Sequence, residues 1–286
     1  MEYLDDIFAS LEWLGLDWDT GPRDPAGFRA RFSQRLRLEE YRAALHRLSA
    51  MREGPGPLVY ACECSRGQAR RAAEAAGLAG IYPGTCRARG LDLSTPEASW
   101  RLRVSGSGDI RIPDLVAGMI PLDPARELGD FVIRQRNGDP AYQVASVVDD
   151  EALGINLVVR GMDLLPSTAG QLVLARYLEA GTFAGAEFLH HGLVVDGAMA
   201  IADSAAQGAT GQGQGKLSKS AGDGPGEATV HALRQGLGGP ERIYGFFARL
   251  LGMEPAGRVG VRDLLEGFSV DRIPSGPIRW EDFHSS

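Results

Sequence analysis

The sequence has almost no lysine. Of its 30 basic residues only Lys216 and Lys219 are lysine, and both lie in the pentapeptide Lys-Leu-Ser-Lys-Ser that ends at Ser220. All other basic positions are arginine, so lysine at these two places indicates a need for a compact ammonium group that a planar guanidinium cannot replace. Binding phosphate oxygens as a point charge is the most common need of this kind.

Long apolar runs are also absent. No stretch approaches the roughly 20 uncharged apolar residues that cross a bilayer. Residues 1–5 contain acidic residues and no basic one, whereas a signal peptide begins with basic residues and continues with apolar ones. A chain of 286 residues with 44% hydrophobic content can bury an ordinary core. We therefore expect a globular protein of the cytoplasm.

An excess of positive charge is missing as well. The net charge is -7, which argues against a protein that coats nucleic acid without specificity. Arginines nevertheless cluster between residues 29 and 52 and again between residues 66 and 89. These clusters are consistent with solvated helix faces or with RNA contacts, and composition alone leaves both interpretations open.

Only three cysteines occur, Cys62, Cys64 and Cys86. An odd number of cysteines close together suits a reducing compartment, and it favours a local metal or thiol role over a disulfide framework. A tetrahedral structural zinc needs four ligands, so three thiolates leave one position to fill. None of the five histidines lies near these cysteines in the sequence. The cysteines alone leave a zinc site and three free or buried thiols as alternatives.

Apolar periodicity predicts helical ends and a mixed centre. Helical patterns occupy residues 4–14, 41–48, 65–76, 142 onward, 167–180 and 243–251. Strand patterns occupy residues 57–62, 100–104, 131–133, 157–159 and 193–195. From residue 130 the strands alternate with helices, which predicts a parallel sheet that binds its ligands at the carboxyl ends of the strands.

The lysine pentapeptide resembles the KMSKS loop of class I aminoacyl-tRNA synthetases. Further motifs follow the order and spacing of the glutamate-specific branch of that class: Asp130-Phe-Val-Ile-Arg134, Pro140-Ala-Tyr142, Val147-Val-Asp-Asp150 and Val158-Val-Arg-Gly-Met-Asp-Leu-Leu165. The resemblance implies that Lys216 and Lys219 are catalytic, with Lys219 on the ATP phosphates, and that Tyr142 and Arg160 bind glutamate. An arginine fork can grip a carboxylate that a tyrosine hydroxyl orients. The alternative is that Arg160 pairs with Asp163 on the surface.

In the alternative with Arg160 on the surface, Tyr142 would be a core residue.

The adjacent carboxylates Asp149 and Asp150 invite an acid–base or magnesium role, but neighbours in sequence do not face one site on a helix. A capping or positioning role is therefore favoured for them.

The spacing Cys62-x-Cys64 and Tyr82-x-x-x-Cys86 resembles short members of this branch, which attach glutamate to queuosine in the anticodon of tRNA(Asp). In those members a tyrosine is the fourth ligand, so the resemblance implies a structural zinc held by Cys62, Cys64, Tyr82 and Cys86. It also implies a monomeric ligase whose substrates are L-glutamate, ATP with Mg²⁺ and tRNA(Asp), with no membrane partner. Charging of the tRNA 3′ end and an inactive tRNA-binding paralogue remain alternatives.

The implied fold is α/β, a Rossmann-like class I catalytic domain with an inserted small α+β domain. Residues 1–59 and 126–225 are expected to form the catalytic domain, residues 60–125 the inserted zinc-containing domain, and residues 226–286 a C-terminal helical segment. The family begins with a strand and a HIGH-type loop, whereas residues 1–19 resemble the helix that follows them. Activity of the chain as given is therefore in question. A start codon assigned too far downstream and a genuine truncation both explain this pattern.

Overall fold

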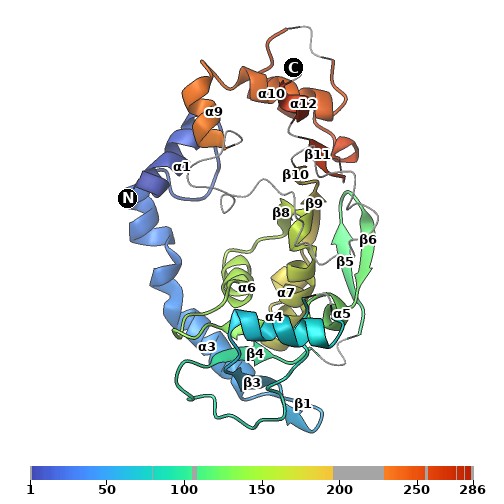
Figure 1. The fold of residues 1–286 in the computed structure, drawn as a ribbon. Coiled ribbons are helices and arrows are strands. Elements are labelled where there is room, and N and C mark those ends of the chain that lie inside the picture. Colours follow the sequence, from blue (N-terminus) through green and yellow to red (C-terminus); the bar gives the residue numbers. More distant parts are fainter. Residues whose placement is uncertain are drawn as a thin grey trace. The chain divides into compact units, whose positions relative to one another are not determined.

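The computed structural model, drawn as a ribbon in Figure 1, describes residues 2–78, 80–104, 108–195, 229–254, 257–274, 276–279 and 281–284. These residues fall into two compact units. The first unit comprises residues 37–190. The second comprises residues 2–36, 191–195 and the described residues from 229 onward. Within the described part of the chain, no helix combines the length and apolarity needed to cross a membrane.

Helices and strands alternate in the first unit. Its helices are α3 (Leu38–Ser49), α4 (Arg66–Ala75), α5 (Pro124–Glu127), α6 (Tyr142–Ala152), α7 (Leu165–Leu178) and α8 (Gly181–Ala184). Its strands are β1 (Arg52–Glu53), β2 (Gly56–Pro57), β3 (Val59–Cys62), β4 (Ser99–Leu102), β5 (Ile110–Asp114), β6 (Gly118–Leu122), β7 (Val132–Arg134), β8 (Leu157–Gly161) and β9 (Glu187–His191). The four longer helices predicted for this unit are confirmed to within a few residues.

One sheet of this unit has the order β3-β4-β7 and is antiparallel throughout. Val59 pairs with Leu102, and Trp100 pairs with Arg134. The prediction of a parallel sheet is wrong for β7. Parallel neighbours need a crossover connection, which is usually a helix, but the chain between β4 and β7 returns through the hairpin of β5 and β6.

The other sheet has the order β6-β5-β9-β8. Strand β5 is antiparallel to β6 and parallel to β9, where Asp114 pairs with Phe188. Of the strands predicted from the sequence this sheet contains β8, whereas β5, β6 and β9 were not predicted. Helix α7 packs against β5 and α6. It is buried on nearly all sides, and a methyl group at Gly170 would come within 2.5 Å of Leu128. This central helix fixes the polar side chains that it carries into the core.

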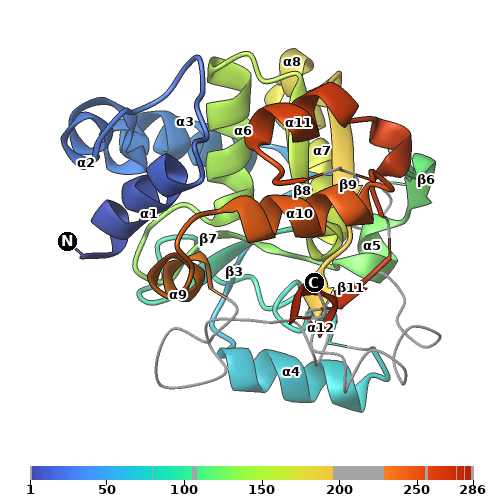
Figure 2. The same ribbon diagram turned by 90° about the horizontal axis from the view of Figure 1, so that it is seen from above.

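The second unit is mainly helical. Its elements are α1 (Glu2–Trp13), α2 (Pro25–Gly27), β10 (Val194–Val195), α9 (Val230–Gly236), α10 (Glu241–Leu250), α11 (Val261–Gly267), β11 (Ile278–Arg279) and α12 (Glu281–His284). Asp6 on α1 contacts His231 and Arg234 on α9 at 2.6 and 2.5 Å. Helix α10 packs against α11 and α12 (Figure 2), and the predicted apolar stripe buries Ile243 and Phe246.

Candidate functional site

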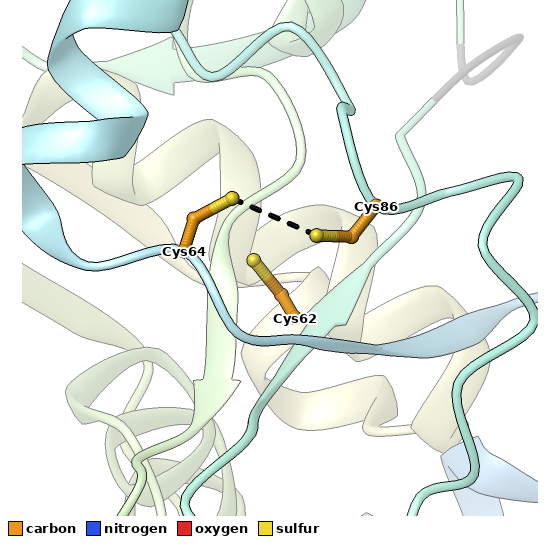
Figure 3. Close-up of side chains that lie close together, drawn as sticks. All are labelled: Cys62, Cys64 and Cys86. Atoms are coloured by element: carbon orange, nitrogen blue, oxygen red, sulfur yellow. Dashed lines mark hydrogen bonds between the residues drawn. The ribbon is translucent and has the colours of Figure 1, made fainter.

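The three cysteines and Tyr82 come together at the end of β3, and Figure 3 shows the three thiols converging. All Sγ atoms lie within 4.8 Å of one another, and those of Cys64 and Cys86 are 3.6 Å apart. The Tyr82 hydroxyl is 3.3 Å from the Cys62 Sγ and 3.5 Å from the Cys64 Sγ. We call these four residues the Cys/Tyr cluster.

The spacing of the Cys/Tyr cluster fits a tetrahedral zinc. With Zn–S distances of about 2.3 Å and a Zn–O distance of about 2.0 Å, two sulfurs lie about 3.8 Å apart and a sulfur and an oxygen about 3.5 Å apart. Three separations in the cluster, of 3.3, 3.5 and 3.6 Å, are close to these values, and the remaining sulfur pairs lie within 4.8 Å. The side chains of Cys62, Tyr82 and Cys86 are buried, so the cluster is also shielded from water.

Local structure places each member of the cluster. Cys62 ends the buried strand β3, and Cys64 precedes α4, whose first turn is closed by a capping box between Ser65 and Gln68. Tyr82 forms a backbone bridge with Gly129, whose φ is +64°. A Cβ at Gly129 would lie 2.5 Å from Ile81 and 3.2 Å from the Tyr82 carbonyl, so this close approach requires glycine.

Two arginines border the Cys/Tyr cluster. The Arg101 guanidinium lies 3.8 Å from the centre of the Tyr82 ring, and its Nε is 3.4 Å from the Cys62 Sγ. Arg89 places Nη1 3.7 Å from the Cys86 Sγ. Burial opposes ionisation of Cys86, but hydrogen bonds from Tyr82 and Arg89 outweigh it and lower the pKa of this thiol to about 7. Arg89 therefore favours the thiolate of Cys86, whereas burial raises the pKa of Cys64 and of the Tyr82 hydroxyl.

A buried carboxylate anchors the loop that carries Cys86. Arg87, the next residue, makes a two-bond ion pair with Asp130, which is fully buried. Asp130 also accepts hydrogen bonds from the Tyr60 hydroxyl at 2.6 Å and the Val104 amide at 3.0 Å. The loop is therefore attached to the β3-β4-β7 sheet independently of the cluster.

Arg160 and Tyr142 lie near each other in the first unit. Arg160, on β8, is buried at 8% exposure, while Tyr142, the first residue of α6, is 52% exposed. The alternative of a surface Arg160 with a core Tyr142 is therefore wrong. Burial lowers the pKa of Arg160, and the charges of Tyr142 and Asp150 offset part of this effect.

The Arg160 guanidinium is held by neutral side chains. Nη1 donates to the Gln171 Oε1 at 2.7 Å and to the Thr168 Oγ1 at 3.3 Å. No carboxylate of the described residues forms an ion pair with Arg160. A buried cation without a counter-ion is costly, so the site favours an entering carboxylate.

Asp149 has a structural task. Its carboxylate accepts two hydrogen bonds from Arg37, at 2.8 and 3.0 Å, and one from the Tyr41 hydroxyl at 2.6 Å. These bonds tie α6 to the start of α3, which confirms the positioning role predicted for Asp149. Asp150 is different, because burial raises its pKa and the nearby Arg160 opposes that rise.

A basic cavity of about 440 Å³ lies beside α3, and its lining contains two arginines and one aspartate, Asp139. Arg42 and His46 of α3 line it together with Trp100 and Arg134, whose guanidinium is 4.9 Å from the centre of the Trp100 ring. Part of the arginine clustering seen in the sequence therefore lines a concave surface and not a flat helix face.

The lysine motif belongs to a part of the chain that the structure does not describe. Lys216 and Lys219 lie outside the described residues. Of the predicted site residues, the structure brings together Tyr142 with Arg160, and Cys62, Cys64 and Cys86 with Tyr82.

Residues 1–194 match a family model described as the catalytic domain of class I tRNA synthetases (E and Q). A glutamyl-Q tRNA(Asp) synthetase of Symbiobacterium thermophilum is 37% identical over 95% of this chain and 78% of its own length. One of Geobacter sulfurreducens is 42% identical over 75% of this chain and 59% of its own length. A glutamate–tRNA ligase 2 of Syntrophus aciditrophicus is 33% identical over 96% of this chain. The chain spans 53% of that relative.

The fold has a counterpart among solved structures. A glutamate tRNA ligase from Elizabethkingia meningosepticum, solved in complex with its amino acid, superposes with a TM-score of 0.66 at 22% identity. The match covers 97% of this chain and 57% of that one. The described elements therefore adopt the mixed α/β fold of that solved structure.

Proposed function

Because this chain belongs to the class I tRNA synthetases for glutamate and glutamine, whose catalytic domain its residues 1–194 match, we propose that it is a ligase that activates glutamate with ATP and transfers the glutamyl group to queuosine in the anticodon of tRNA(Asp). The observation that carries the proposal is the buried guanidinium of Arg160, which has only neutral hydrogen-bond partners among the described residues. A glutamate side chain supplies the missing carboxylate.

The reaction proceeds in two balanced steps. An α-carboxylate oxygen of glutamate attacks the α-phosphorus of ATP, and the bond to the leaving pyrophosphate breaks. A hydroxyl of the tRNA then attacks the carbonyl carbon of the adenylate, loses its proton and displaces AMP. Arg160 and Tyr142 hold the side-chain carboxylate of glutamate, and Lys216 and Lys219 stabilise the charge on the departing pyrophosphate with Mg²⁺.

The Cys/Tyr cluster has a structural role in this proposal. Cys62, Cys64, Tyr82 and Cys86 hold one zinc ion, whose fit rests on the tetrahedral separations. The ion crosslinks β3 to the loop of Tyr82 and Cys86 and takes no part in glutamate activation.

The same proposal assigns tasks to larger parts of the chain. Residues 1–59 and 126–225 form the catalytic domain, residues 60–125 the inserted tRNA-facing domain, and residues 226–286 a helical segment. The basic cavity at Arg42 and Arg134 contacts RNA phosphate, because its cations are combined with the Trp100 ring. The enzyme acts as a monomer in the cytoplasm.

The test of activation is glutamate-dependent exchange of labelled pyrophosphate into ATP. Wild-type protein is expected to catalyse the exchange, and Arg160→Gln is expected to raise the KM for glutamate roughly tenfold to a hundredfold, because charge-assisted bonds contribute about 1.5–3 kcal/mol. Arg111→Gln, an exposed arginine of β5, is the matched control. Lys219→Arg keeps the charge but changes its geometry, so it is expected to slow exchange at unchanged KM for glutamate.

The transfer step separates two candidate functions. Labelled glutamate is expected on tRNA(Asp) that contains queuosine and not on the same tRNA without it. The similarity to a glutamate–tRNA ligase over 96% of the chain favours charging of the 3′ end as the second candidate. Label on queuosine-free tRNA for glutamate would establish that second function. Salt-dependent tRNA binding without any exchange would instead identify an inactive paralogue.

A further inference from the structure

Arg160 uses one of its nitrogens on the protein and leaves an edge free. Both bonds to Gln171 and Thr168 come from Nη1, which carries two hydrogens. Among the described residues, Nη2 and Nε of Arg160 have no hydrogen-bond partner. The Phe188 ring lies 5.8 Å from the guanidinium carbon and limits its rotation. This arrangement presents the Nη2–Nε edge, which can bind a carboxylate through two parallel bonds.

Gln171 can bind Arg160 in only one orientation. Arginine has no acceptor, so the amide oxygen of Gln171 must face Nη1. The side chain is fully buried, and its Nε2 has no acceptor among the described residues. An unpaired buried donor costs about 1–3 kcal/mol. Gln171 therefore costs folding stability while it fixes the position of Arg160.

Thr168 is held by a second chain of hydrogen bonds. Its Oγ1 is 2.8 Å from the His190 Nε2, and the His190 Nδ1 is 2.7 Å from the Asp114 Oδ2. A carboxylate only accepts, so Nδ1 of His190 carries a proton. The Thr168 hydroxyl has one proton, which faces either the His190 Nε2 or the Leu164 carbonyl at 3.2 Å, and its oxygen keeps a lone pair in both cases. The Thr168 oxygen is then left to accept from Arg160.

Asp114 is the fixed end of this series of hydrogen bonds. Its Oδ1 accepts from the amides of Val116 and Ala117 at 2.9 and 2.8 Å, and its Oδ2 accepts from the amide of His190 at 2.9 Å. Asp114, His190 and Thr168 come from β5, β9 and α7, so three elements determine the position of one hydroxyl group.

We propose that Gln171 and Thr168, with His190 and Asp114 behind Thr168, are positioning residues that orient the Nη2–Nε edge of Arg160 for the side-chain carboxylate of glutamate. This inference rests on the proposed function, in which Arg160 binds that carboxylate. The four residues do not touch the substrate and act through Arg160. Loss of either bond to Nη1 lets the guanidinium rotate, which weakens glutamate binding and leaves ATP binding unchanged.

Gln171→Met is the decisive variant. It removes both the amide oxygen that binds Arg160 and the unpaired Nε2 donor. Because the loss of a stabilising bond and the loss of an unpaired donor offset each other, the melting temperature is expected to stay near that of the wild type. In pyrophosphate exchange the KM for glutamate is expected to rise roughly tenfold, the effect of losing one bond to a charged group, at unchanged KM for ATP. Gln143→Met is the matched control, because Gln143 is a part-buried glutamine of α6 that bonds Ser167 and not Arg160.

A threonine pair gives an independent readout. Thr168→Val keeps the shape and removes the hydroxyl, so it is expected to raise the KM for glutamate, whereas Thr168→Ser restores the wild-type value. A KM for glutamate within twofold of wild type in both Gln171→Met and Thr168→Val overturns the inference and leaves the proposed function standing. Absence of glutamate-dependent exchange in the wild type overturns both. If Gln171→Met does not fold, the threonine pair decides.

Discussion

Charge balance around the Cys/Tyr cluster is decided by single residues. Three thiolates and a phenolate carry two more negative charges than one zinc ion neutralises. Arg101 and Arg89 supply two positive charges, one stacked on the Tyr82 ring and both within 3.7 Å of a sulfur. A phenolate ligand is uncommon, and an arginine on its ring would stabilise the phenolate that the proposed zinc site requires.

Arg101→Gln is accordingly expected to weaken zinc binding about 10- to 100-fold, as loss of a supporting group around a metal typically does. Competition with a chromophoric chelator measures the affinity. Arg111→Gln removes an exposed arginine elsewhere and serves as the control. Equal zinc affinities for the two variants would mean that Arg101 does not stabilise the bound anions.

Asp114 predicts a pH dependence of stability. Burial alone would raise its pKa, but hydrogen bonds from the Ala117 and Val116 amides and from His190 outweigh burial and lower it. A lowered pKa in the folded state contributes stability that is present above about pH 4, the unfolded value, and that is lost as pH falls through the folded value. We expect the free energy of unfolding of the wild type to exceed that of Asp114→Asn by about 2 kcal/mol at neutral pH.

That difference in free energy of unfolding should shrink as pH falls below about 4. Urea unfolding of both proteins at several values between neutrality and the acid range measures it. A difference that stays constant down to the acid limit would contradict the assignment of the ionised carboxylate as the stabilising form.

At the scale of elements, Gly129 allows the turn before β7 to approach the backbone of Tyr82, with which it forms a backbone bridge. Its φ of +64° is easy for glycine only, and its Cα faces Ile81 and the Tyr82 carbonyl. Gly154 has a similar φ of +67° but nothing within 4 Å of an added Cβ. The two glycines therefore separate backbone strain from steric contact.

Gly154→Ala is expected to cost about 1–2 kcal/mol from backbone strain alone, and Gly129→Ala clearly more, because it adds the clash with Ile81. Thermal unfolding of both variants measures the difference. Gly129→Ala should also weaken zinc binding by displacing Tyr82, and Gly154→Ala should not. Equal destabilisation by the two variants would show that the contact at Gly129 relaxes freely.

Local periodicity was sufficient for the longer helices of residues 37–190 and insufficient for strands β5, β6 and β9. Helix α4 carries a Ser-x-x-Gln capping signal and small residues, and both can be recognised in sequence. Strand β9 was missed because Phe188, Leu189 and His190 form a contiguous buried run without alternation. The β5–β6 hairpin was missed although Ile110 and Ile112 alternate with Arg111, because the surrounding glycines and prolines resemble a loop.

The residues of the candidate site likewise divide into those that the sequence predicted and those that only the structure assigns. Cys62, Cys64, Tyr82 and Cys86 were identified because they are close in sequence and fit a family spacing. The bond between Asp114 and His190 joins residues 76 positions apart, and no local pattern reports such a contact. Gln171 is a neutral residue on a buried helix, so only the structure assigns it a partner.

At the scale of the whole molecule, the Cys/Tyr cluster lies entirely within the unit of residues 37–190. Binding of a metal ion to the folded form stabilises that unit by mass action. Removal of zinc is therefore expected to lower its melting temperature by several degrees, because about 1 kcal/mol corresponds to roughly 2–4 °C at this size.

Differential scanning calorimetry before and after dialysis against a chelator measures this effect. Zinc should restore the transition and magnesium should not, since thiolates select zinc. Cys86→Ser is expected to melt at the temperature of the chelated protein whether or not zinc is added. A chelator that leaves the wild-type transition unchanged would contradict a structural metal.

The Cys86 loop is attached at two adjacent residues, and this should determine the kinetics with which the cluster takes up a metal ion. Cys86 belongs to the cluster, and Arg87 is locked to the buried Asp130. The ion pair restrains the backbone beside Cys86 without any metal ion, so we expect uptake of the proposed zinc to be a simple encounter with a largely formed site and not a coupled folding event. Its rate should then rise in proportion to the free ion concentration, without the plateau that a slow prior ordering of the chain would impose.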